Sequence, residues 1–159
     1  RNIRNHMPGY RVHILGGLAT FCSIWFLLSK CSAINAISGV MLLQWAGACV
    51  LGALFPDVDT KSKGQGIFYK TMFVIQLFLL WKKQLSLFIL LSFVSLIPLL
   101  VTHRGVFHRV WFLIATPLVL ASVAGVSFPA HQAIFLTNAL FFIAGALSHI
   151  ALDKVPYLS

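Results

Sequence analysis

Long apolar runs, separated by short polar breaks, occupy most of the chain. Six of these runs are long enough to cross, or nearly to cross, a hydrocarbon core of about 30 Å as helices. They are apolar on every side rather than along one stripe, as is typical of buried or lipid-facing helices. A backbone in lipid must satisfy its own hydrogen bonds, so the pattern predicts an all-α polytopic membrane protein, a bundle of about six transmembrane helices. The runs cover residues 12–29, 33–55, 67–81, 85–102, 110–128 and 133–152.

The composition excludes an ordinary soluble domain. Of the 159 residues, 59% are hydrophobic and 9% are charged, whereas soluble chains carry about 25% charged residues. The mean hydropathy of +0.91 is strongly positive. The length allows one transmembrane domain, which we expect over residues 7–159. Residues 1–6 precede Met7 across a His-Met junction that is typical of a cloning site, and we expect them to be a vector-derived remnant.

Positive charge is distributed unevenly between the two ends of the predicted bundle. With six crossings, the N-terminus, the 56–66 and 103–109 breaks and the C-terminus share one end. Even without residues 1–6, that end carries seven Lys and Arg residues and the other end three. The positive-inside rule therefore predicts that both termini are cytoplasmic. The net charge of +9 favours anionic lipid over nucleic acid, because no basic patch is interleaved with exposed aromatic residues.

Residues that can bind metal gather at the same end. The chain has three acidic residues and six histidines, and all the acids and four of the histidines lie at the predicted cytoplasmic end. Ionisable groups at membrane depth are costly and are usually functional. This convergence predicts a metal site at that end of the domain. The candidate ligands are His13, Asp57, Asp59, His103, His108, His149 and Asp153.

The spacing of these residues suits metal coordination. His149 and Asp153 are four residues apart, so on a helix they project from one face. Asp57 and Asp59 follow a proline in a segment predicted to be extended or turn-like, where two carboxylates can chelate one ion or bridge two. Mixed imidazole and carboxylate ligation favours zinc, manganese or iron over calcium or magnesium. For any one of these residues, a hydrogen bond to a lipid headgroup or a turn cap is the simpler alternative.

Four motifs follow one another along most of the chain: MPGYRVHILGG with His13, LFPDVD with Asp57 and Asp59, HRGVFH with His103 and His108, and HIALD with His149 and Asp153. Together they resemble a bacterial family of inner-membrane proteins described as metal-dependent hydrolases. One member of that family is controlled by the DNA-damage repressor LexA. The order of ligands is also similar, more remotely, to the helical zinc-dependent phospholipase C enzymes. The first resemblance implies a multi-pass protein of the bacterial inner membrane, and the second implies a phosphoester substrate.

These observations predict a hydrolase whose active site faces the cytoplasm and which acts on a membrane lipid ester, with a phosphoester preferred. One or two divalent ions, preferably zinc with manganese or iron as alternatives, would activate a water molecule. We expect Asp59 to act as general base as well as metal ligand, and Arg104 to pair with a phosphoryl oxygen. Lys61, Lys63 and Lys154 are candidate headgroup contacts, for which a plain orientation signal is the alternative.

Two further function classes remain open at this point. A cation transporter would use the same ligands, but a transport path needs polar groups through the bundle. The central parts of the six runs carry few such groups, namely Gln44, Gln76 and Asn138. A non-catalytic membrane protein with a structural metal is the other alternative.

Overall fold

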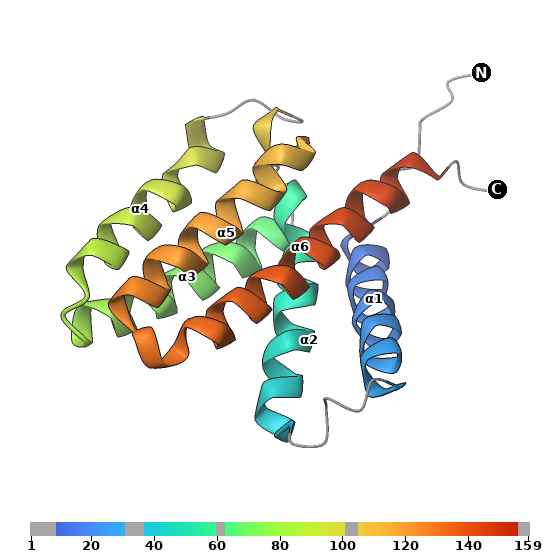
Figure 1. The fold of residues 1–159 in the computed structure, drawn as a ribbon. Coiled ribbons are helices and arrows are strands. Elements are labelled where there is room, and N and C mark those ends of the chain that lie inside the picture. Colours follow the sequence, from blue (N-terminus) through green and yellow to red (C-terminus); the bar gives the residue numbers. More distant parts are fainter. Residues whose placement is uncertain (1–8, 31–36, 60–62, 101–104, 156–159) are drawn as a thin grey trace.

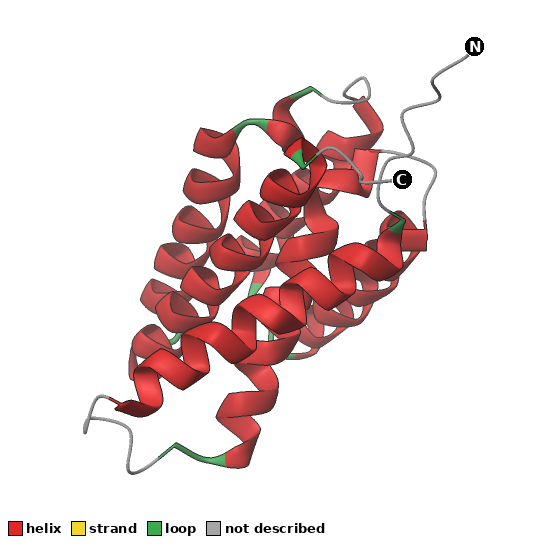
Figure 2. Cartoon of the chain, turned by 90° about the vertical axis from the view of Figure 1, so that its right-hand side faces the viewer, coloured by secondary structure: helices red, strands yellow, loops and turns green. Residues whose placement is uncertain are grey.

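The computed structural model describes residues 9–30, 37–59, 63–100 and 105–155. Every regular element in these ranges is a helix, and none is a strand (Figure 2). The prediction of an all-α protein with six long helices is therefore confirmed for this part of the chain. The helices are α1 (Tyr10–Lys30), α2 (Gly39–Leu54), α3 (Lys63–Trp81), α4 (Leu85–Leu100), α5 (Val110–Ser127) and α6 (Gln132–Lys154), with short 3-10 helices η2 (Phe55–Asp59), η3 (Val106–His108) and η4 (Pro129–His131).

Four segments in the described ranges are long and apolar enough to cross a membrane. They are Tyr10–Lys30, Gly39–Val58, Val110–Ser127 and Pro129–Lys154, which correspond to α1, α2 with most of η2, α5, and η4 with α6. By contrast, α4 has 16 residues and is therefore about 24 Å long. The chain is thus a polytopic helical membrane protein, and the crossing of α3 and α4 stays a prediction.

The structure refines three local expectations from the sequence. The second helix begins at Gly39 rather than near residue 33, because the Ser38 side chain caps it by accepting a hydrogen bond from the Met41 backbone N–H at 3.3 Å. The third helix begins at Lys63 rather than at residue 67, since its polar first turn is compatible with a helix but carries no hydropathy signal. The segment with both aspartates was predicted to be extended or turn-like. It is the 3-10 helix η2, which is closer to the turn-like alternative because a 3-10 helix is a succession of tight turns.

Helices α1, α2 and α6 cross at close range because glycines line their contacts. Figure 1 shows α6 passing across α2, with α1 beside them. A Cβ atom on Gly145 would collide with the backbone carbonyl of Cys49, and one on Gly52 with the carbonyl of Phe142. On α1, a Cβ atom on Gly17 would lie 3.1 Å from the same Cys49 oxygen. Small residues allow membrane helices to approach in this way.

An aromatic core holds the 3-10 helices η2 and η3 at one end of the bundle. Phe55 of η2 and Phe107 of η3 pack edge to face, with ring centroids 5.3 Å apart. Phe107 and Val58 have no exposed surface, and both belong to the buried cluster that continues into α3, α5 and α6. Because Asp57 and His108 are the chain neighbours of Val58 and Phe107, this packing holds both of their backbones in place.

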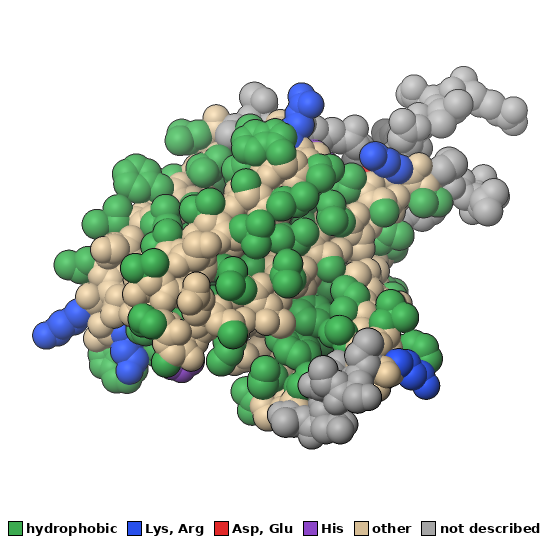
Figure 3. Space-filling model, viewed as in Figure 1, with side chains coloured by type: hydrophobic (Ala, Val, Ile, Leu, Met, Phe, Trp, Pro, Cys, Tyr) green, Lys and Arg blue, Asp and Glu red, His purple; other side chains and the backbone are tan. Residues whose placement is uncertain are grey.

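The surface is consistent with a lipid environment. Figure 3 shows hydrophobic side chains over the body of the visible face, with Lys and Arg side chains near its upper and lower margins. Trp81 and Trp111, at the end of α3 and the start of α5, are 74% and 64% exposed. Aromatic residues at helix ends are typical of the headgroup region.

Candidate metal centre

His149 of α6 lies at the centre of the candidate site and has no exposed surface. Its Nδ1 atom is 2.7 Å from the backbone carbonyl oxygen of Ala53 on α2. A carbonyl only accepts hydrogen bonds, so Nδ1 carries the proton and donates it. In the neutral ring, Nε2 then presents its lone pair. Metal-binding histidines are commonly oriented by such a hydrogen bond.

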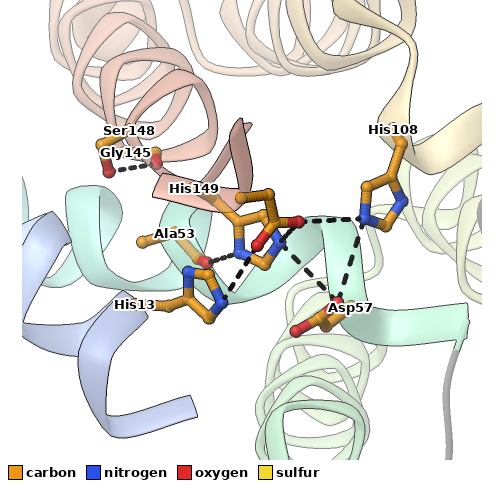
Figure 4. Close-up of polar contacts among 8 residues, drawn as sticks. His13, Ala53, Asp57, His108, Gly145, Ser148 and His149 are labelled. Carbon is orange, nitrogen blue, oxygen red and sulfur yellow. Dashed lines mark hydrogen bonds and ion pairs between the residues drawn. The ribbon is translucent and has the colours of Figure 1, made fainter. Parts of the chain in front are cut away.

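The lone pair of His149 Nε2 faces carboxylate oxygens. The Oδ2 atom of Asp153 is 3.3 Å away and the Oδ1 atom of Asp57 is 3.7 Å away. Within the described ranges, no residue forms a hydrogen bond to this buried nitrogen. Figure 4 shows His149 pointing toward Asp57 from the side opposite Ala53. Acceptor atoms that converge in this way are stabilised by a cation among them.

Two more histidines complete the cluster. His13 of α1 is 1% exposed, and its ring stacks on that of His149 with centroids 3.8 Å apart. Its Nε2 atom lies 3.6 Å from Oδ1 of Asp153. His108 of η3 places its Nε2 atom 3.9 Å from Oδ1 of Asp57 and 3.8 Å from Oδ2 of Asp153. Five candidate metal ligands therefore converge from α1, η2, η3 and α6.

The spacing of these donors fits a shared metal ion. Two donors bound to one tetrahedral zinc at about 2.1 Å lie about 3.4 Å apart. The nitrogen-to-oxygen distances in the cluster run from 3.3 Å to 3.9 Å. Two overlapping triads each keep all donor atoms within 4.8 Å: His13, Asp57 and His149 form one, and His108, His149 and Asp153 form the other. With neutral imidazoles, the two carboxylates balance the charge of one divalent cation.

The chemical types of the candidate ligands and their partial exposure are compatible with a metal ion that is reachable from solvent. Imidazole with carboxylate ligation is compatible with zinc, manganese and iron. Asp57, Asp153 and His108 remain 29%, 21% and 17% exposed, while His13 and His149 are buried. A hollow of about 280 Å³ opens beside the cluster and is lined by His108, Ile150, Asp153 and Lys154. The cluster is therefore anchored on its inner side and reachable on its outer side.

The structure brings five of the seven predicted ligands together: His13, Asp57, His108, His149 and Asp153. Of the predicted substrate contacts, Lys154 lines the hollow, whereas the Lys63 ammonium lies over the ring of Tyr10, 5.3 Å from its centroid. Four predicted site positions lie outside the described residues: the side chain of Asp59, and Lys61, His103 and Arg104.

The close helix crossing explains why these ligands meet. On α6, His149 follows Gly145 by one helical turn, and on α1, His13 precedes Gly17 by one turn. Asp57 lies four residues beyond Ala53, whose carbonyl orients His149. Sequence reasoning missed Ala53, since a backbone acceptor leaves no signal in the sequence. It also missed the glycines, although their four-residue spacing from the histidines is visible in the sequence.

The fold and the cluster define a polytopic helical membrane protein with a His/Asp cluster that could bind a metal ion. The family model of the YdjM inner membrane protein matches residues 7–156. The chain therefore belongs to the YdjM inner membrane protein family, and its predicted location in the inner membrane is confirmed. Neither the curated proteins nor the solved structures contain a significant match.

Proposed function

We propose that the protein is an integral-membrane, metal-dependent hydrolase that cleaves a membrane lipid ester, with a phosphoester as the preferred substrate. The observation that carries the proposal is the buried His149 Nε2 lone pair, which faces two carboxylate oxygens next to an open hollow. A purely structural metal would be served by a closed site, whereas catalytic sites leave a position for water or substrate.

Each side chain has a distinct task in this proposal. His149, held by the Ala53 carbonyl, supplies the innermost donor. Asp153 spans the cluster, because its Oδ1 atom faces His13 while its Oδ2 atom faces His108 and His149. A bound divalent ion would supply Lewis acidity and an activated water nucleophile.

Residues around the hollow would bind the substrate. Lys154 lines the hollow, and its ammonium group would attract an anionic phosphoester oxygen there. Ile150, also in the lining, provides apolar contact for the hydrocarbon part of a lipid. Two roles are added from the sequence motifs: Asp59 acts as general base, and Arg104 contacts a phosphoryl oxygen.

The test is hydrolysis of phospholipids and isoprenoid phosphates in vesicles that contain purified protein of measured metal content. We expect turnover by the wild type, its loss on adding a chelator and its return on adding metal. His149→Ala should be inactive. His131→Ala is the matched control, since this histidine is exposed in η4, on a different 3-10 helix from the cluster, and should retain activity. Metal binding without turnover on any of these lipids would refute the hydrolase and favour a structural metal.

A further inference from the structure

A second group of charged side chains joins the beginnings of α1 and α3. Lys63 Nζ lies 5.3 Å from the centroid of the Tyr10 ring, and Arg11 Cζ lies 5.9 Å from it. The Arg11 Nε–H also donates a hydrogen bond to the Tyr10 hydroxyl at 3.3 Å. We call Tyr10, Arg11 and Lys63 the Tyr10 cluster. It shares no residue with the metal ligands or with the lining of the hollow.

The contact between Lys63 and Tyr10 differs from the other cation–π contacts among the described residues. Lys30 lies over Phe26, and Lys82 lies over Phe78 and Trp81, so those contacts join residues at most four positions apart. Such pairs follow from the helix repeat or from chain proximity alone. The Tyr10 cluster instead depends on tertiary folding, which brings a second cation to a ring that already holds one.

Among the side chains that the structure describes, which do not include that of Asp59, the Tyr10 cluster has no acidic counter-charge within 4.0 Å. No Lys or Arg among them lies within 4.0 Å of a carboxylate, and Asp57 and Asp153 face imidazoles instead. The two cations near this ring repel each other, so an anion that contacts both of them would be stabilised by both. Arg and Lys together are typical ligands of phosphate oxygens.

The surroundings of the Tyr10 cluster match a lipid rather than a free anion. On α1, Leu15 follows Arg11 by four residues and is 65% exposed. On α3, Ile67 follows Lys63 by four residues and is 38% exposed. Each cation therefore has an exposed apolar side chain one turn further along the same helix face. This arrangement offers contacts for a phosphate group and for the hydrocarbon chain attached to it.

We propose that the Tyr10 cluster is a binding site for the phosphate of an anionic phospholipid in the leaflet at the metal-cluster end. Basic pockets between membrane helices are known to hold such headgroups. Binding at this site does not require hydrolysis, so the proposal stands apart from the proposed function.

Native mass spectrometry with added phosphatidylglycerol or phosphatidylcholine tests the proposal. Arg11→Gln with Lys63→Gln should weaken phosphatidylglycerol binding roughly 10- to 30-fold. The matched control is Lys82→Gln with Lys83→Gln, which removes the same charge from the α3–α4 turn and should change binding less than about twofold. Equal losses in both double variants would show that only net charge matters and would overturn the proposal.

Further measurements distinguish a lipid site from a site for a free anion. Tyr10→Phe should bind nearly as well as the wild type, since the ring that places the cations remains, whereas Tyr10→Ala should bind more weakly. Inorganic phosphate at millimolar concentration should not displace phosphatidylglycerol, and complete displacement would assign the cluster to a free anion and refute the lipid site. His149→Ala should retain lipid binding, so failure of the hydrolase proposal would leave this result unchanged. Circular dichroism confirms that each variant is folded.

Discussion

Replacing Gly145 by alanine tests whether the close crossing of α2 and α6 builds the metal cluster. The added Cβ atom would collide with the Cys49 carbonyl oxygen and lie 2.8 Å from the carbonyl carbon and 3.0 Å from the Ala53 nitrogen. All three are backbone atoms of α2, so no side-chain rotation can relieve the contact. The helices must move apart.

The size of the movement follows from the contact distances. Raising the 2.8 Å contact to the optimal carbon–carbon separation of about 3.5–4.0 Å requires a shift of about 1 Å. His149 lies one turn beyond Gly145, and the same shift would stretch its 2.7 Å bond to the Ala53 carbonyl beyond hydrogen-bonding range. Loss of such an orienting partner weakens metal binding about 10- to 100-fold. Overpacking also costs about 1–3 kcal/mol of stability.

Competition with a fluorescent chelator measures the affinity of each variant for zinc. Gly47→Ala is the matched control, because a Cβ atom there meets nothing within 4 Å and the residue lies in α2, the helix that Gly145 of α6 contacts. We expect this control to keep wild-type affinity and to gain up to about 1 kcal/mol of helix stability. Equal zinc affinity for Gly145→Ala and Gly47→Ala would refute the link between the helix crossing and the metal cluster.

Three further predictions concern the parts that support the site. Phe107→Ala, at a fully buried position next to His108, should lower stability by about 3–5 kcal/mol and weaken metal binding, as measured by chemical denaturation and chelator competition. Ser38→Ala removes the cap of α2 and should cost about 0.5–2 kcal/mol while leaving zinc affinity unchanged; a large loss of zinc would contradict the separation of cap and site. Chelator should lower the melting temperature of the wild type but not that of Asp153→Asn, since a ligand that binds only the folded state stabilises it; an equal decrease in both would show that the chelator acts elsewhere.

The helices could be predicted from hydropathy because each apolar run is long, is apolar on every side and ends at a polar break. The first residues of α2 and α3 could not be predicted in this way, since the Ser38 cap and the polar first turn of α3 depend on local hydrogen bonding rather than on hydropathy. The 3-10 geometry of η2 was missed because a proline before two aspartates is equally compatible with an extended segment.

The ligand set could be anticipated because acids and histidines are scarce in this chain and fall at one predicted end. The geometry of the ligand set could not be predicted, because the Ala53 carbonyl that orients His149 is a backbone group and leaves no signal in the sequence. The meeting of Tyr10 with Lys63 was likewise invisible, since the two residues are far apart in the chain and touch only after α1 and α3 are placed.

Elemental analysis of the purified protein tests the metal centre most directly. The wild type and His131→Ala should each contain zinc, manganese or iron at close to one or two ions per chain, and His149→Ala should contain little. Gel filtration and circular dichroism serve as controls that the three proteins are equally folded. A wild type without bound metal, even after zinc or manganese is added, would contradict the metal centre, as would a His149→Ala variant with undiminished metal.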